Sequence, residues 1–102
     1  MDSLTEKVRE VVAGYAGKAL NGKTYLTQSA DRTVFTVVGI ARVDGKRVSS
    51  VSLIARIVGD VIVVELDQND KPLVDALVQA SILREQIILA YKGEPVPEPE
   101  TV

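Results

Sequence analysis

The sequence predicts a single α+β domain, in which an antiparallel sheet of four to five strands carries two helices on one face. Three observations predict this class. Residues 3–19 place apolar side chains at the period of a helix, and residues 33–66 are runs of β-branched residues separated by tight-turn pairs. Residues 61–91 then follow the order strand, helix, strand. Two layers are enough to bury the apolar faces of such elements.

The length and composition fit one folded unit. With 102 residues, 46% of them hydrophobic, the chain can bury an ordinary core without disulfides or metals. We expect residues 1–92 to form the domain. Residues 93–102 place three of the four prolines among glutamates and offer little apolar surface, so we expect a flexible acidic tail there.

The first helix is predicted over residues 3–19. Its apolar residues recur every three or four positions and form one stripe, which can pack against the sheet. Gly17 and the pair Asn21-Gly22 end the helix, because these residues tolerate left-handed backbone angles. The stripe comprises Leu4, Val8, Val11, Val12, Tyr15, Ala16 and Ala19.

Three strands are predicted next, over residues 23–28, 33–43 and 48–57. The first is short and flanked by polar residues, which is typical of an edge strand. The second and third are joined by Asp44-Gly45, a pair favoured in two-residue hairpin turns because both positions adopt positive φ. In the third strand, alternation predicts one shared face for Val51, Leu53, Ala55 and Ile57.

The last third of the chain predicts a strand over residues 61–66, a second helix, and a strand over residues 86–91. Pro72 suits the first turn of the helix, and the apolar residues that follow it have helical spacing as far as Ser81. A connection of this length can place the last strand parallel to residues 61–66. An antiparallel position at the sheet edge is the alternative, and the sequence leaves both open.

The strand predicted over residues 33–43 is apolar on both faces. Two helices cover one face of such a sheet, so the second face needs another layer. We therefore expect a homodimer, or a heterodimer with a partner protein. One face carries Phe35, Val37 and Ala41, and the other carries Val34, Val38 and Ile40.

The residue types present exclude most catalytic chemistry. The chain has no histidine, cysteine or tryptophan, which removes the usual general bases, thiol nucleophiles and metal-ligand sets. Residues 17–24 match the phosphate-loop pattern GxxxxGK[ST]. That loop follows a strand and opens a helix, whereas here a helix precedes it and a strand follows. We therefore predict a protein that is not an enzyme and that has no cofactor and no metal site.

Charge is distributed unevenly along the chain. Residues 1–58 hold nine Lys and Arg against five Asp and Glu, a net charge of +4, whereas residues 59–102 hold three against nine, a net charge of −6. The overall charge of −2 is too acidic for a general nucleic-acid binder. The basic residues of the meander are either a solvated rim or a contact surface for a partner or polyanion. The candidate contact residues are Arg32, Arg42, Arg47, Arg56, Glu65 and Asp67.

The chain predicts a cytoplasmic protein without membrane contact. Its first residues, MDSLTEKV, are acidic and lack the basic and apolar regions of a signal peptide. No apolar run approaches the length of about 18 residues that a membrane span needs. The absence of cysteine fits a reducing compartment.

A recognisable pattern extends over residues 4–91, with matches at Tyr15-Ala16, Asp31, Arg32, Phe35, Val37, Val38, Arg47, Leu73 and Leu77. Residues 81–91 read SILREQIILAY, similar to the run G-[IV]-P-x-x-[DQ]-I-[IV]-L-[AG]-[FY], with Ser81 and Leu83 in place of the glycine and proline. This pattern resembles the XisI family, the excision controlling factors first associated with the fdxN element of heterocyst-forming cyanobacteria.

The resemblance implies a regulatory, accessory role in DNA rearrangement. Members of the XisI family are described as controlling site-specific excision alongside a recombinase and a companion protein, XisH, without catalysing strand exchange. The resemblance therefore implies an XisH-like protein partner. The alternative is a small nucleic-acid- or ligand-binding module that uses the basic hairpin around Arg42 and Arg47, with direct DNA contact left open.

Overall fold

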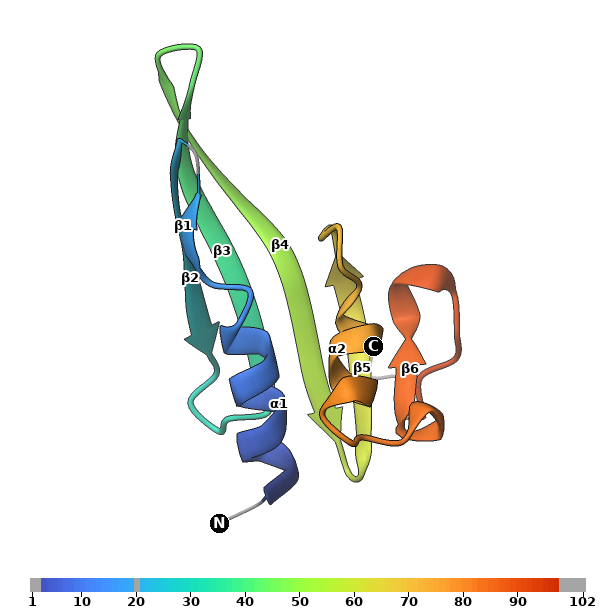
Figure 1. Cartoon of the computed structure of the whole chain (residues 1–102). Coiled ribbons are helices and arrows are strands. Elements are labelled where there is room, and N and C mark those ends of the chain that lie inside the picture. The colour runs from blue at the N-terminus through green and yellow to red at the C-terminus, as the bar shows by residue number, and fades with distance from the viewer. Residues whose placement is uncertain (1–2, 20, 98–102) are drawn as a thin grey trace.

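The fold is a six-stranded sheet whose strands lie side by side in chain order (Figure 1). The computed structural model describes residues 3–19 and 21–97. Neighbouring strands are antiparallel from β1 to β5, and β6 is parallel to β5. The elements are α1 Ser3–Ala13, β1 Gly17–Ala19, β2 Gly22–Gln28, β3 Val34–Val43, β4 Lys46–Val58, β5 Val61–Asp67, α2 Leu73–Gln79, η1 Arg84–Gln86, β6 Ile87–Leu89 and η2 Ala90–Lys92.

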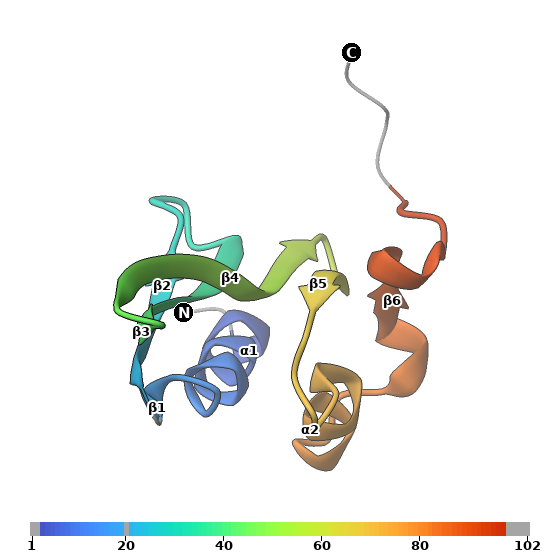
Figure 2. The ribbon, with the colours of Figure 1, turned by 90° about the horizontal axis from the view of Figure 1, so that it is seen from above.

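Both helices lie on the same side of the sheet, as Figure 2 shows. The core forms between them and the strands, where valines of α1 and leucines of α2 meet the inward side chains of β3, β4 and β5. The predicted α+β class, with both helices on one face, is confirmed. The core residues are Val8, Val12, Phe35, Val37, Leu53, Ala55, Ile62, Val64, Leu73, Leu77, Ile82, Ile87 and Leu89.

The first helix is shorter than predicted and ends at Ala13. Gly14 and Gly17 both disfavour helix, and the N–H of Gly14 is shared between the carbonyls of Glu10 and Val11, each at 3.2 Å. Gly17 has a φ of 151° and begins β1. The apolar residues keep helical spacing beyond Gly14 as far as Ala19. The low helix propensity of the two glycines nevertheless ends the helix at Ala13.

The additional strand β1 means that the prediction of residues 23–28 as an edge strand was wrong. β1 pairs with β2 through Gly17 opposite Thr24. The hydroxyl of Thr24 accepts a hydrogen bond from the N–H of Gly17 at 2.9 Å, which fastens the two strands. The phosphate-loop pattern over residues 17–24 is therefore part of a β-hairpin.

The sheet is also mixed and six-stranded, whereas four to five antiparallel strands were predicted. After β5, the chain crosses through α2 and returns as β6 in parallel, with Ile62 opposite Ile87 and Val64 opposite Leu89. Of the two directions that the sequence left open, the parallel one is the direction found. A helix between two neighbouring strands is the connection that parallel pairing requires.

A β-bulge changes the predicted face of one residue. The register shifts between Val37 and Val38, so that Val51 pairs with Val38 on the face away from the helices. Ser52, which has no paired residue on β3 at the bulge, accepts hydrogen bonds at its carbonyl from the backbone N–H of Gln68 and the side-chain amide of Asn69. The predicted alternation holds for the other three residues, because Leu53 and Ala55 are buried and Ile57 packs against the core.

The β3–β4 hairpin extends beyond the helices and the other strands, at the top of Figure 1. Residues 42–51 are exposed along this extension. Asp44 and Gly45 at its tip have φ angles of 51° and 78°, as predicted for a two-residue hairpin turn.

The start of the predicted tail is attached to the domain. The carboxylate of Glu94 accepts a hydrogen bond from the backbone N–H of Leu89 at 2.8 Å and lies 3.5 Å from Arg84 Nη2. Residues 98–102, the rest of the tail predicted over residues 93–102, lie outside the described residues.

Candidate functional site

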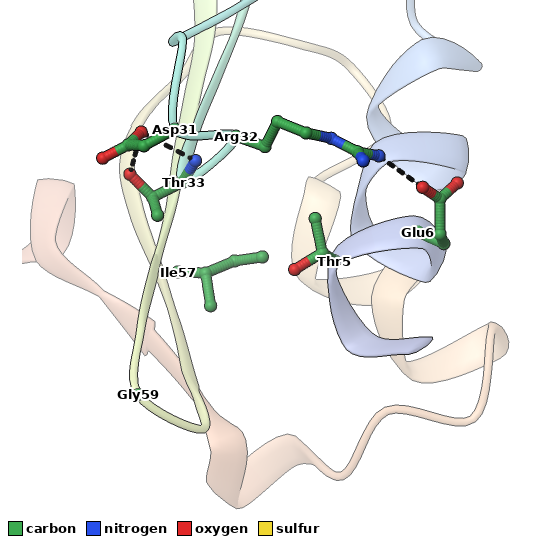
Figure 3. Close-up of a pocket in the computed structure, with 7 residues that line it drawn as sticks. All are labelled: Thr5, Glu6, Asp31, Arg32, Thr33, Ile57 and Gly59. Carbon is green, nitrogen blue, oxygen red and sulfur yellow. Dashed lines mark hydrogen bonds and ion pairs between the residues drawn. The ribbon is translucent and has the colours of Figure 1, made fainter. Parts of the chain in front are cut away.

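Arg32 lies in the turn between β2 and β3 and points toward α1 (Figure 3). Its backbone is left-handed, with a φ of 61°, and its Nη2 forms an ion pair with Glu6. The Nε of Arg32 is buried and has no hydrogen-bond partner among the described residues. These groups and Thr5, Asp31, Thr33, Ile57 and Gly59 line a surface pocket of about 410 Å³.

The carboxylate next to Arg32 is already occupied by local donors. Asp31 accepts hydrogen bonds from the hydroxyls of Ser29 and Thr33, at 2.6 and 2.8 Å, and from the N–H of Thr33 at 3.2 Å. The bond from Ser29, followed by those from Thr33, lowers the pKa of Asp31 below its ordinary value. The charged groups of this pocket therefore hold the turn and α1 together.

Arg56 and Glu65 form an ion pair of 2.8 Å between Nε and Oε2 on the face of the sheet away from the helices. They become neighbours because the β4–β5 register shifts between Ile54 and Ala55 and leaves Glu65 as the extra residue of β5. Both side chains remain partly exposed. An ion pair of this kind fixes orientation more than it adds stability.

Asp67 lies at the end of β5 and holds the start of α2. Its Oδ2 accepts a hydrogen bond from the backbone N–H of Leu73, the first residue of α2, at 2.6 Å. Its Oδ1 accepts bonds from the backbone N–H and the side-chain amide of Asn69, at 3.1 and 2.9 Å. Asp67 therefore serves the fold in the role that an N-cap residue usually has.

Arg42 and Arg47 remain available for contact. They lie directly opposite each other on the projecting hairpin and line a shallow pocket of about 280 Å³ together with Lys23 and Tyr25. Lys23 Nζ lies 5.1 Å from the centre of the Tyr25 ring, a cation–π contact. Within residues 3–19 and 21–97, Lys23, Arg42 and Arg47 form no ion pair.

The outer face of the sheet, which is the face away from the helices, is largely apolar where β2, β3 and β4 meet. Tyr25 and Val51 are 41% and 37% exposed on it. The sequence indicated the apolar character of this face, but it missed Val51 and Tyr25, because the bulge and the pairing of β2 with β3 are tertiary features. The apolar residues of the outer face on β2 to β5 are Tyr25, Val34, Val38, Ile40, Val51, Ile54, Val63 and Leu66, of which Val63 is buried.

Tyr15 and Tyr91 are partly buried and pack against the core. The hydroxyl of Tyr15 donates to the carbonyl of Lys71 at 2.9 Å. Burial, followed by the negative charges of Asp67 and Asp75, raises the pKa of Tyr15 and of Tyr91. Both phenols therefore stay protonated and pack as partly buried neighbours of the core.

Among the described residues, no three potential ligands come close enough together to hold a metal ion. Nor does any helix in this part of the chain have the length and apolar content needed to cross a membrane. The arrangement offers two kinds of surface, an apolar sheet face and a cationic hairpin end. Such surfaces can bind other macromolecules.

The XisI protein family model matches residues 1–98 of the chain. A crystal structure of a XisI-like protein from Anabaena variabilis shares the fold, with 17% identity, a TM-score of 0.71, and 84% of this chain and 82% of that chain covered. The fdxN element excision controlling factor XisI from the same organism is similar at 20% identity, with a TM-score of 0.66 and coverages of 86% and 88%. No curated protein matches the chain significantly.

Proposed function

Because the chain belongs to the XisI family, we propose that it is a non-catalytic accessory factor that helps to control the site-specific excision of a DNA element through protein contacts. The fold is shared with a protein described as an excision controlling factor. The lack of histidine and cysteine in the sequence supports a role without bond-making chemistry. The proposal places the protein in the cytoplasm, beside the DNA that is rearranged.

The outer face of the sheet is the observation that carries this proposal. Both helices pack against the opposite face (Figure 2). Partly exposed apolar side chains on β2, β3 and β4 therefore meet solvent in the single chain. An apolar surface of this kind favours contact with another protein. Tyr25, Val38 and Val51 lie side by side across three strands and give that partner a continuous surface.

The first partner in the proposal is a second copy of the chain. Two identical sheet faces related by a two-fold axis bury the same residues on both copies, which is the usual geometry of a homodimer. The second partner is an XisH-like companion protein, which binds the assembled dimer. Four of the six residues expected to contact a partner form ion pairs or a helix cap within the chain, namely Arg32, Arg56, Glu65 and Asp67. We therefore propose that the companion contacts the other two, Arg42 and Arg47.

The experiment that tests the function is deletion of the coding sequence in the native host, followed by quantitative sequencing of excision junctions. We expect the frequency of excision of at least one DNA element to change and to be restored by the wild-type chain. Val51→Glu on the outer face is expected to fail to restore it, because a charge there disfavours the apolar contact. Unchanged junction frequencies after deletion contradict the proposed function.

Val78→Glu is the matched control. Val78 is 44% exposed on α2, close to the 37% of Val51, and lies on the helical side of the molecule. The same substitution there changes charge and hydrophobicity equally but leaves the outer face intact. We expect Val78→Glu to restore excision control. Co-expression with an XisH-like companion then tests the partner: release of the companion in high salt supports contact through Arg42 and Arg47, and full retention contradicts it.

A further inference from the structure

The projecting end of the β3–β4 hairpin is cationic in an otherwise acidic molecule. Residues 17–19, 21–23 and 39–50, which form this end with the neighbouring strands, hold five basic residues and one acidic residue, a net charge of +4, whereas the chain as a whole has −2. The basic residues are all exposed. They are Lys18, Lys23, Arg42, Lys46 and Arg47, and the acidic residue is Asp44.

The arrangement of these charges is unfavourable in the free protein. Arg42 and Arg47 are directly opposite each other in the ladder, and like charges in that position destabilise a strand pair. Their shallow pocket also contains Lys23, and no carboxylate lines it. Arg42 Nη1 lies 3.4 Å from the carbonyl of Gly45, a neutral acceptor. A bound anion would supply the countercharge that the described residues do not provide.

The shape of the hairpin selects the kind of anion. Two antiparallel strands that extend beyond the domain form a ribbon, and the major groove of B-form DNA admits a two-stranded ribbon. The major groove of duplex RNA is too deep and narrow for this. Single strands need several stacking aromatic residues, and Tyr25 is the aromatic residue that lines this pocket.

We propose that the end of the β3–β4 hairpin binds duplex DNA, with Lys23, Arg42 and Arg47 contacting phosphates. Arginine is suited to this because its planar group can donate two hydrogen bonds to one phosphate. The inference goes beyond the proposed protein contacts. It depends on the charge and shape of the hairpin end, whose pocket shares Tyr25 and Ile40 with the outer face.

The test uses fluorescence anisotropy of a labelled DNA duplex of about two helical turns with the purified chain over a series of salt concentrations. We expect a dissociation constant of about 10⁻⁵ M in low salt. The double variant Arg42→Ala/Arg47→Ala should weaken binding by about tenfold or more. It should also reduce the slope of log K against log salt by about 1.8, because two phosphate contacts are lost.

Lys7→Ala/Arg9→Ala is the matched control, since it removes the same charge from α1, away from the hairpin. It should leave both the affinity and the salt slope unchanged. Circular dichroism checks folding, and the hairpin variant should fold normally because its two side chains are exposed.

Four results would overturn the inference: no DNA binding in low salt, equal losses in both variants, a salt slope unchanged by the hairpin variant, or tighter binding to duplex RNA. Val51→Glu disrupts the outer face and is expected to bind DNA normally. If it does, DNA binding and the outer-face contact are tested separately.

Discussion

The carboxylate of Asp67 shows how one side chain joins a strand to a helix. It accepts the first N–H of α2 from Leu73 and also fixes the connecting residue Asn69. Helix α2 begins after Pro72, whose side chain offers no acceptor, so the acceptor comes from the end of β5.

We expect Asp67→Ala to lower the free energy of unfolding by about 1–2 kcal/mol, because the N-terminal amide of α2 loses its acceptor. Urea denaturation followed by circular dichroism measures this. Asp70→Ala removes an exposed carboxylate from the same connection and should change stability by less than about 0.5 kcal/mol. Equal losses in the two variants would show that Asp67 has no capping role.

Asp31 predicts a pH dependence of stability. Hydrogen bonds from Ser29 and Thr33 favour its ionised form and lower its pKa below the ordinary value of 3.8. Its contribution to stability is therefore present above that ordinary value and is lost as the pH falls through the lower pKa of the folded state. We expect Asp31→Asn to melt at a lower temperature than the wild type near neutral pH, and the difference to shrink in acid. A melting-temperature difference between wild type and Asp31→Asn that grows in acid would contradict a stabilising role of the ionised carboxylate.

At the level of elements, sequence reasoning succeeded where periodicity is local. The hairpin turn at Asp44-Gly45, the alternation of β3 and the position of α2 after Pro72 all follow from neighbouring residues. The early end of α1, the strand β1 and the two bulges could not be predicted in the same way. The early end of α1 reflects Gly14 and Gly17, which the apolar spacing outweighed in the prediction, whereas β1 and the bulges depend on how strands pair, as the bulge that moves Val51 to the outer face shows.

The end of α2 explains why the family pattern has a glycine where this chain has Ser81. Ser81 has a φ of 72°. Its backbone N–H donates to the carbonyl of Val78 at 3.0 Å, and the N–H of Ile82 donates to the carbonyl of Leu77 at 3.1 Å. These bonds form a Schellman motif, in which glycine is preferred at the left-handed position. The glycine of the pattern thus matches the backbone that Ser81 adopts.

We expect Ser81→Gly to raise the free energy of unfolding by about 0.5–1 kcal/mol, because removing the side chain relieves the left-handed strain by more than the added freedom of the unfolded chain. Urea denaturation measures the change. Ser81→Ala retains the Cβ atom and should give no gain. Equal stabilisation by both substitutions would mean that strain at this position is absent.

For the whole molecule, the structure sorts the predicted contact residues into two groups. Arg32, Arg56 and Glu65 form ion pairs within the chain, and Asp67 caps α2. Arg42 and Arg47 remain without ion pairs among the described residues. Charge counts identified all six as candidates, and the tertiary contacts show which of them also hold the fold.

The overall arrangement places an apolar sheet face next to a cationic hairpin end. The proposed homodimer through the outer face would bury apolar residues of both copies, among them Tyr25 and Ile40 beside the hairpin pocket. The central claim is therefore that the outer face is a contact surface between copies.

Light scattering during size-exclusion chromatography, at tens of micromolar protein, tests that claim most directly. We expect a mass twice the 11.0 kDa of one chain for the wild type and for Val78→Glu, and the mass of one chain for Val51→Glu. A wild-type mass of 11.0 kDa at that concentration would contradict the account.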